Sequence, residues 1–460
     1  MNEQSKNSAL FIAYHFPPSS AVGGQRIVNF ARHLPDFGIE PVVLTIKEQH
    51  IERLDNLRLK EIEGVRVIRT GKLRGITNLY LLLKKLFAKG MKDIPAAAGA
   101  GAPVPSRSNS WNPDETFGER ARRRMKSYLI VPDAERDWII PAIIEARREI
   151  KKGGVNCIVT TCPPYSAHLV GLIIKRLTGI RWLADFRDPW MLHGTKKLYP
   201  TSGLSLKLEK RLEQEVLESA DLLIFNTERM RDAYRKKYEH LQPEKFTYLP
   251  NGFEPEKFSR FRGIAKYERF TLVYTGSLYV GRTPEPVFAA VKKLIDNGSL
   301  DERNVSIKLV GECMDMNGRP TAEVAASYGL SSVVEVCAPV PYSAALEMAA
   351  KSHVALLFAP NLPLQIPAKI YDYLGVGARI LALAEDGATA DVIRSTGSGE
   401  SFNASDVEGI AGFIRRSYNE RGQEASRCGA QTNMDVKLIT GKLAGYIIGN
   451  GDNESACDKT

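Results

Sequence analysis

The chain is poor in cysteine and has no long hydrophobic run. Its six cysteines are scattered through 460 residues and none forms a Cys-x-x-Cys pair, so neither a zinc site nor a dithiol redox site is indicated. We expect free thiols, the usual state in a reducing compartment. No run reaches the roughly 18 apolar residues of a membrane span, and the first residues lack the pattern of a signal peptide. These absences predict a cytoplasmic protein.

Basic residues are in modest excess. Lys and Arg number 63 against 53 Asp and Glu, which gives a formal net charge of +10. Such a surface favours anionic partners, among them nucleotides, phospholipid headgroups and nucleic acid, but it is equally typical of a basic surface without such a role. The basic residues do not alternate with aromatic ones, as a single-strand nucleic-acid groove requires, so we expect no nucleic-acid partner.

A strand, a glycine turn and a helix open the chain. The apolar run 9–14 predicts a buried strand, and residues 27–34 carry apolar side chains at helical spacing up to a stop at Gly38. Between them lie Gly23 and Gly24. A glycine pair at such a turn lets the backbone approach a phosphate, which the N-terminus of the helix attracts.

A similar layout recurs about 250 residues later. The strand predicted at 270–274 is followed by Gly276, Ser277, Gly281 and Arg282, and then by a helix. Two turns of this kind suggest two α/β domains that face one nucleotide-bearing ligand. They point to an enzyme that uses a nucleotide sugar.

Strands and helices alternate through both halves, which predicts doubly wound parallel sheets. We expect an N-terminal domain at 1–255, a C-terminal domain at 263–430, a last helix at 431–449 that returns to the N-terminal domain, and a disordered tail at 450–460.

An insertion at 71–135 interrupts the first domain and contains a flexible Ala-, Gly- and Pro-rich loop. Its basic, apolar stretch at 80–87 and its arginine cluster at 120–124 have two interpretations. One is docking to a membrane surface, and the other is a helical insertion packed on the first domain with its charges in water.

Two groups of residues could carry chemistry. Asp185 and Asp188 follow an apolar strand, at the edge where open α/β sheets bind ligands, and could orient sugar or acceptor hydroxyls. Alternatively, an Asp–Arg pair with Arg187 fixes the loop. Lys369 and Asp372 are three residues apart and share one face of a predicted helix, which suits a diphosphate and a ribose. Taken alone, this pair is more often a surface ion pair of little consequence.

Seven segments in order resemble the retaining glycosyltransferases of family 4, which have the two-domain GT-B fold with two Rossmann-like domains facing an interdomain cleft. The resemblance covers nearly the full length, and some segments resemble a subgroup tied to cell-surface polysaccharide synthesis. The segments are YHFPPSSAVGGQR (14–26), TTCPPYSAHLVG (160–171), LADFRDPW (183–190), ADLLIFNT (220–227), YLPNGFEPEKF (248–258), LVYTGSLYVGR (272–282) and IPAKIYDYLGVGARILAL (366–383).

The resemblance implies a role for each matching residue. Asp185 and Asp188 are the expected catalytic carboxylates. Arg282 and Lys369 would neutralise the leaving diphosphate, and Asp372 would hold the ribose hydroxyls. The base would lie near residues 338–340. The expected donor-binding residues are Gly23, Gly24, Arg26, Gly276, Ser277, Arg282, Lys369 and Asp372. Further contacts to the sugar or acceptor are assigned to His15, His168 and Gln365, although a lone histidine is more often a structural hydrogen-bonding residue.

The sequence departs from the family pattern in three places. Leu364 stands where the first of two glutamates is usual, and Asp372 replaces the second. The common Arg-then-Lys pair is incomplete because residues 283–287 contain no lysine, and Lys369 would compensate.

The implied function is transfer of a hexosyl or N-acetylhexosaminyl group from a nucleotide sugar to a glycan or lipid-linked acceptor, with retention and without a metal or other cofactor. We expect a cytoplasmic enzyme that can associate with the inner face of the cell membrane. The alternatives are a catalytically silent sugar-nucleotide-binding scaffold and a nucleotide-sugar 2-epimerase. The motifs do not specify the sugar or the base.

Overall fold

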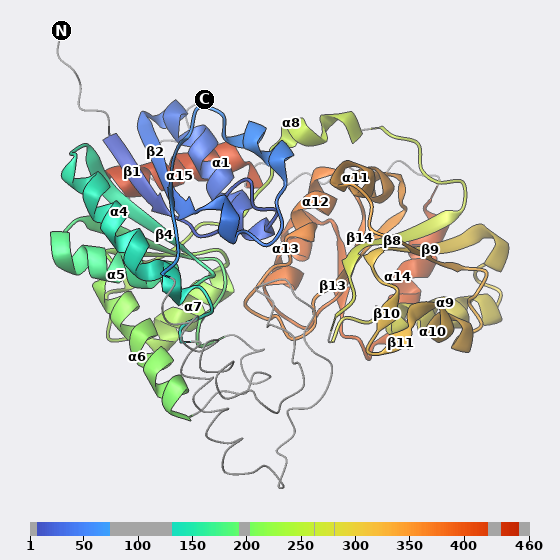
Figure 1. Cartoon of the computed structure of the whole chain (residues 1–460). Coiled ribbons are helices and arrows are strands. Elements are labelled where there is room, and N and C mark those ends of the chain that lie inside the picture. The colour runs from blue at the N-terminus through green and yellow to red at the C-terminus, as the bar shows by residue number, and fades with distance from the viewer. Residues whose placement is uncertain are drawn as a thin grey trace, which may run out of the picture. The chain divides into compact units, whose positions relative to one another are not determined.

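The computed structural model describes residues 7–73, 131–192, 203–261, 263–279, 281–421 and 434–449 (Figure 1). Most of the predicted insertion and the whole predicted tail lie outside these residues. The described chain divides into two compact units. Unit 1 holds residues 7–250 and 436–449, and unit 2 holds residues 251–435. We describe each unit by itself.

Unit 1 is built on a parallel sheet of seven strands. Its order is β3-β2-β1-β4-β5-β6-β7, so the direction of winding reverses between β1 and β4. The carboxyl ends of these two central strands form the switch point at which doubly wound sheets bind ligands. The strands are β1 (Asn7–Ile12), β2 (Ile39–Ile46), β3 (Arg66–Thr70), β4 (Val155–Cys162), β5 (Arg181–Phe186), β6 (Leu222–Phe225) and β7 (Phe246–Tyr248).

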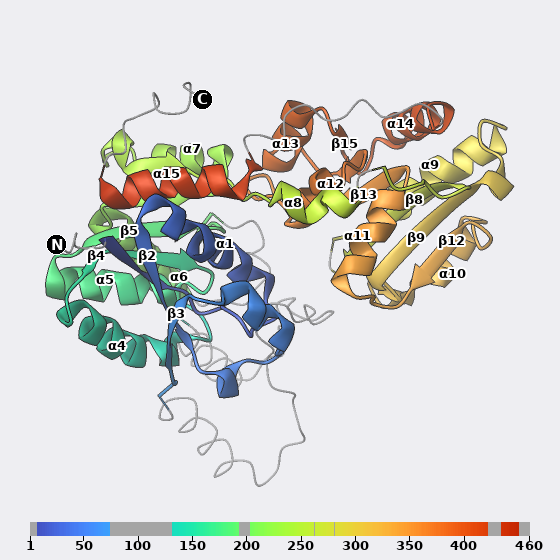
Figure 2. The same ribbon diagram turned by 90° about the horizontal axis from the view of Figure 1, so that it is seen from above.

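Helices cover both faces of this sheet. Successive side chains of a strand point to opposite faces, and Phe11 of β1 packs with Ile27 of α1 (Gln25–His33) and Leu443 of α15 (Val436–Ile448). On the other face lie α4 (Ile139–Lys151) and α5 (Ser166–Thr178), and Figure 2 shows the sheet between α15 and α4. Two further helices are α6 (Gly203–Ser219), which contacts α5, and α7 (Glu228–Lys237).

Unit 2 repeats this plan with six parallel strands. Its order is β12-β9-β8-β13-β14-β15, which is the order of unit 1 without the seventh strand, and its switch point lies between β8 and β13. The strands are β8 (Phe270–Ser277), β9 (Val305–Glu312), β12 (Val334–Cys337), β13 (Val354–Phe358), β14 (Ile380–Leu383) and β15 (Gly399–Phe402). A short hairpin of β10 (Asp315–Met316) and β11 (Arg319–Pro320) follows β9.

The two faces of this second sheet carry different sets of helices. In β13, Leu356 and Phe358 pack toward one face and Ala355 and Leu357 toward the other. The first face is covered by α9 (Glu285–Asp296), α10 (Thr321–Ser327) and α14 (Val407–Asn419). The second is covered by α11 (Tyr342–Lys351), α12 (Lys369–Gly375) and α13 (Ala388–Thr396).

The expected fold class of two doubly wound parallel α/β domains is therefore confirmed. Three details differ from expectation. The short edge strands β7 and β15 were not predicted, because each has only three or four residues and little apolar character. The expected domains leave residues 256–262 between them, yet α8 (Pro255–Phe258) and the following turn bury Phe258 and Phe261 in unit 2. Within the described ranges, no helix has the length and apolarity needed to cross a membrane.

Candidate functional site

The glycine turn of unit 1 lies close against other parts of the same unit. A Cβ atom on Gly24 would lie 2.9 Å from the backbone oxygen of His15, and one on Gly23 would lie 2.7 Å from Nη1 of Arg187. The guanidinium of Arg187 also donates to the backbone oxygens of Gly23, Cys162 (2.9 Å) and Pro163 (2.5 Å). Close contact within the protein therefore accounts for both glycines, and their contact with a phosphate stays a prediction.

Arg26 and Asp185 form a buried ion pair. Their side chains are 4% and 2% exposed, and Nη2 of Arg26 lies 2.9 Å from Oδ1 of Asp185. Arg26 also donates to the backbone oxygens of Leu249 (2.8 Å) and Pro250 (2.7 Å), and Thr161 donates to Asp185 Oδ2 (2.8 Å). A buried pair with this many partners joins α1 to the ends of β4 and β5. We assign it a structural role, and diphosphate binding by Arg26 and catalysis by Asp185 stay predictions.

Asp188 differs from Asp185 because it is partly exposed. Its loop is held on one side by Tyr165, whose hydroxyl donates to the backbone oxygen of Pro189 (2.8 Å). On the other side, Tyr234 accepts from the backbone of Trp190 (2.8 Å) and Glu213 accepts from that of Met191 (2.8 Å). Of the two expected carboxylates, Asp188 is thus the one that is both accessible and firmly placed.

The two histidines assigned to unit 1 lie in different surroundings. His168 is fully buried, and its Nδ1 contacts the hydroxyl of Thr160 at 2.7 Å. Burial and then Arg187 lower the pKa of His168 to about 3. Such burial is typical of a structural histidine. It does not support the expected contact between His168 and the sugar or acceptor. His15 is half-buried, and burial, Arg187 and Lys72 lower its pKa to about 4, so it is neutral at pH 7.

In unit 2, Lys369 lies over Gly276, near the carboxyl end of β8. A Cβ atom on Gly276 would collide with Cε of Lys369 and lie 2.9 Å from its Nζ, so only a glycine leaves room for the lysine there. Burial lowers the pKa of Lys369, as does the nearby positive charge of Arg282, whereas Asp372 acts in the opposite sense. The guanidinium of Arg282 lies over the ring of Tyr279, 4.1 Å from its centroid. Two cations therefore lie near each other at the carboxyl end of β8.

Asp372 lies one turn of α12 after Lys369. Its Oδ1 accepts a hydrogen bond of 2.5 Å from the hydroxyl of Tyr342, the first residue of α11. Burial raises the pKa of Asp372 to about 6, although Tyr342 and Lys369 lower it. A carboxylate placed beside Lys369 in this way can accept hydrogen bonds from the hydroxyls of a ribose.

The other expected donor-binding residues belong to neighbouring loops of unit 2. The Ser277 hydroxyl, at the end of β8, lies 3.4 Å from Oε2 of Glu312, the last residue of β9. Gln365 lies in the segment between β13 and α12, and its backbone oxygen accepts from Thr389 (3.3 Å). Ser277 thus lies at the carboxyl end of a strand and Gln365 lies after one, as a ligand contact requires.

Comparisons with known proteins agree with this geometry. Residues 96–257 match the model of Glycosyltransferase Family 4. The chain has the GT-B fold, and its residues 96–257 are similar to Glycosyltransferase Family 4. Among curated proteins no sequence matches it.

Solved GT-B structures resemble it over nearly its whole length. One is a glycosyltransferase from Rickettsia africae, at 14% identity and a TM-score of 0.60 over 97% of this chain and 99% of that one. Another is sucrose-phosphate synthase from Thermosynechococcus elongatus, at 14% identity and 0.56 over 96% and 98%. A third is Anabaena HepE in complex with UDP-glucose, at 12% identity and 0.54 over 96% and 97%.

Several residues that shape the GT-B sheet edges were not assigned from the sequence. Tyr342 contacts Asp372, but the motifs gave no signal for it. Glu135 and Lys72 border the predicted insertion, and burial together with Asp133 raises the pKa of Glu135 to about 7, whereas Lys72 lowers it. Glu213 accepts hydrogen bonds from Tyr234, Tyr238 and Lys237. Its only signal in the sequence was that it is a glutamate within an otherwise amphipathic helix.

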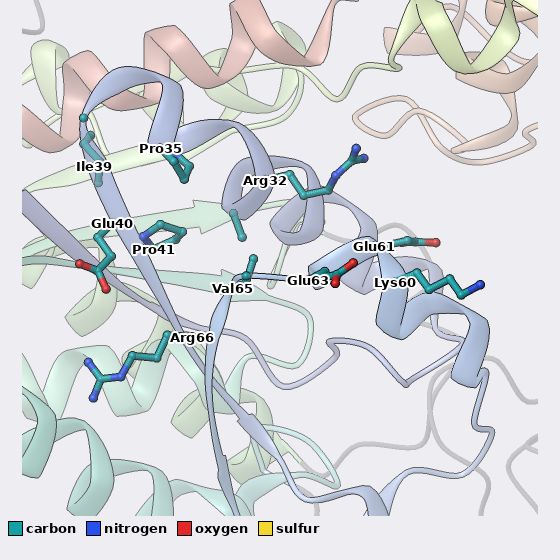
Figure 3. A pocket seen from close by; sticks show the side chains of 13 residues that line it. Arg32, Pro35, Ile39, Glu40, Pro41, Lys60, Glu61, Glu63, Val65 and Arg66 are labelled. Carbon is teal, nitrogen blue, oxygen red and sulfur yellow. The ribbon is translucent and has the colours of Figure 1, made fainter.

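A hollow within unit 1 lies away from these residues. It has a volume of about 530 Å³ and lies at the amino ends of β2 and β3, whereas the expected ligand contacts follow carboxyl ends (Figure 3). Its charged lining is already paired in part, because Arg66 contacts Glu149 at 2.6 Å and Glu61 contacts Arg58 at 3.4 Å. We assign it no role in the reaction. In the part of the chain that the structure describes, no group of three or more His, Cys, Asp or Glu side chains is placed to hold a metal ion.

Proposed function

We propose that this GT-B protein is a retaining glycosyltransferase that moves a hexosyl or N-acetylhexosaminyl group from a nucleoside diphosphate sugar to a glycan or lipid-linked acceptor, in the synthesis of a cell-surface polysaccharide. The observation that carries the proposal is the group formed by Lys369, Arg282 and Asp372 around Gly276 in unit 2. It combines two cations for a diphosphate with a carboxylate for a ribose.

The electrostatics of Lys369 support a diphosphate ligand. Its pKa is lowered by burial and by Arg282, so the fold holds two positive charges near each other at some cost. Among the described residues Lys369 makes no ion pair with a carboxylate, and the negative charge of Asp372 is the first cause that raises its pKa. A diphosphate would supply the missing negative charge, and this is the charge that grows when a glycosyl bond to phosphate breaks.

The proposed reaction proceeds on one face of the sugar. The bond between the anomeric carbon and the β-phosphate oxygen breaks, and the acceptor oxygen bonds to the same carbon from the same side. The acceptor proton passes to an oxygen of the leaving diphosphate. Lys369 and Arg282 stabilise that leaving group without a metal, and the protein otherwise positions the two substrates.

The acceptor is assigned to unit 1, where Asp188 is the accessible carboxylate of its motif and His15 is a neutral, half-buried imidazole. Both lie beyond the carboxyl ends of strands, and both can bond to sugar hydroxyls. The HepE complex with UDP-glucose supports a nucleoside diphosphate hexose as the first donor to test.

The test is release and transfer. Purified protein is incubated with UDP-, GDP- and ADP-sugars, with and without oligosaccharide or polyprenyl-linked acceptors, and both the free nucleotide and the anomeric configuration of the product are followed by NMR. We expect acceptor-dependent nucleotide release with retention. Nucleotide binding without any release would favour the silent scaffold, and a 2-epimerised sugar would favour the epimerase.

A further inference from the structure

Tyr342 joins two elements at the ligand edge of unit 2. It follows β12 as the first residue of α11, and its hydroxyl reaches Asp372 on α12, which follows β13. The two strands lie on opposite sides of β8 and β9 in the sheet. The hydrogen bond of 2.5 Å therefore joins two helices that follow different strands, and it lies at the group proposed to hold a nucleotide.

The contact occupies one oxygen of Asp372 in the way that a ribose hydroxyl would. A phenol O–H donates to Oδ1, and a ribose O–H donates to a carboxylate with the same geometry. A ribose hydroxyl that approaches Oδ1 from the side of the tyrosine competes with it for that oxygen.

The ring of Tyr342 is uncovered although its hydroxyl is engaged. The residue is 64% exposed. The four large apolar side chains of unit 2 that are exposed in the described structure all follow carboxyl ends of strands: Tyr279 (42%) after β8, Met314 (64%) after β9, and Val340 (36%) and Tyr342 after β12. Exposed apolar side chains gathered at one edge mark a binding surface, and a flat aromatic face there suits a nucleobase.

We propose that Tyr342 is a nucleoside-exchange residue: it gives up its hydrogen bond to Asp372 when a ribose binds, and its ring then packs against the base. This inference rests on the proposed function, because it assumes a nucleotide at this edge. It adds a competing residue and a base contact that the motifs do not contain.

Two variants separate the two parts of the proposal. Tyr342→Phe removes only the competing hydroxyl, so UDP, GDP or ADP should bind about three- to tenfold more tightly than to wild type. The 2′,3′-dideoxy analogue of the same nucleotide has no hydroxyl to exchange, so its affinity should be unchanged. Tyr342→Ala also removes the ring and should bind the nucleotide about tenfold more weakly than Tyr342→Phe, whereas inorganic pyrophosphate should bind both variants equally.

Tyr328→Phe serves as the matched control. Tyr328 lies in the same unit but packs against Phe288 on the opposite face, so no affinity should change. Because Tyr342 is exposed, its variants should melt within about 1 °C of wild type. The dissociation constants are measured by isothermal titration calorimetry on the full chain.

Three results would overturn the proposal. Weaker nucleotide binding by Tyr342→Phe would mean that the hydroxyl positions Asp372 in the bound state instead of leaving it. Equal affinities of wild type and both variants would remove any role for Tyr342 while leaving the donor site intact. Absence of binding by wild type to every nucleotide would overturn the proposed function together with this inference.

Discussion

Lys369 is the residue whose removal should affect ligand binding and folding in opposite ways. It lies over Gly276 with a lowered pKa, and among the described residues it makes no ion pair. The folded protein therefore bears the cost of a half-buried cation that it does not fully compensate. Replacement by methionine keeps most of the side-chain volume and removes that charge.

The expected magnitudes follow from these surroundings. A hydrogen bond between an ammonium and a phosphate contributes about 1.5–3 kcal/mol, so Lys369→Met should weaken binding of the preferred nucleoside diphosphate by about ten- to 150-fold. Its free energy of unfolding should stay within about 1 kcal/mol of wild type or rise, because the described residues form no ion pair with the ammonium.

The matched control is Lys266→Met in the same unit. The ammonium of Lys266 donates to the backbone oxygens of Ala350 (2.8 Å) and Ser352 (2.9 Å), so its loss should lower the free energy of unfolding by about 1 kcal/mol and leave nucleotide affinity unchanged. Affinity is measured by calorimetry and stability by urea unfolding. Equal losses of affinity and stability in Lys369→Met would refute the diphosphate role, since the lysine would then be structural.

Four further predictions concern three carboxylates and one glycine. Because burial raises the pKa of Asp372 to about 6, affinity for a nucleotide sugar should rise as the pH increases from 5 to 7, and Asp372→Asn should abolish this rise in a calorimetric titration. The pKa of Glu135 is raised from 4.5 to about 7, so the protonated side chain contributes fully to folding stability below pH 4.5, and this contribution is lost as the pH rises to about 7. Glu135→Gln should therefore make the melting temperature less dependent on pH over that range. Asp185→Asn should lower the free energy of unfolding by about 3–5 kcal/mol, because it leaves Arg26 buried without its counter-charge. Gly24→Ala should lower the free energy of unfolding by about 1–3 kcal/mol, because the added Cβ atom approaches the backbone oxygen of His15 too closely. Urea unfolding midpoints check both variants, and unchanged midpoints would contradict the assigned contacts.

Sequence patterns predicted the fold because it depends mainly on local properties. Each central strand is a continuous apolar run, as expected for a parallel strand covered on both faces, and the helices between them have one apolar face. The run at 270–274 lies within β8 as predicted, and the run at 9–14 overlaps β1. Edge strands such as β15 lack this signal because helices and neighbouring strands cover them less.

The environment of each site residue was less predictable, because it depends on contacts between distant residues. Asp185 has the expected place at the end of its strand, yet its partner Arg26 lies 159 residues away, and this pairing decides that the carboxylate is buried. Likewise, Tyr342 and Asp372 meet only because α11 and α12 pack on one face of the sheet. Residue type and spacing identify which edge holds a group but do not specify its partners.

The central claim is that the edge of unit 2 around Lys369 and Asp372 binds a nucleotide sugar. The most direct measurement is the shift in melting temperature of wild type and Asp372→Asn with UDP, GDP, ADP and CMP and with their sugar conjugates. We predict that one nucleotide and its sugar conjugate stabilise wild type, since a ligand that binds only the folded state raises the melting temperature, and that the variant loses most of this shift. Equal shifts in both proteins, or none with any nucleotide, would contradict the account.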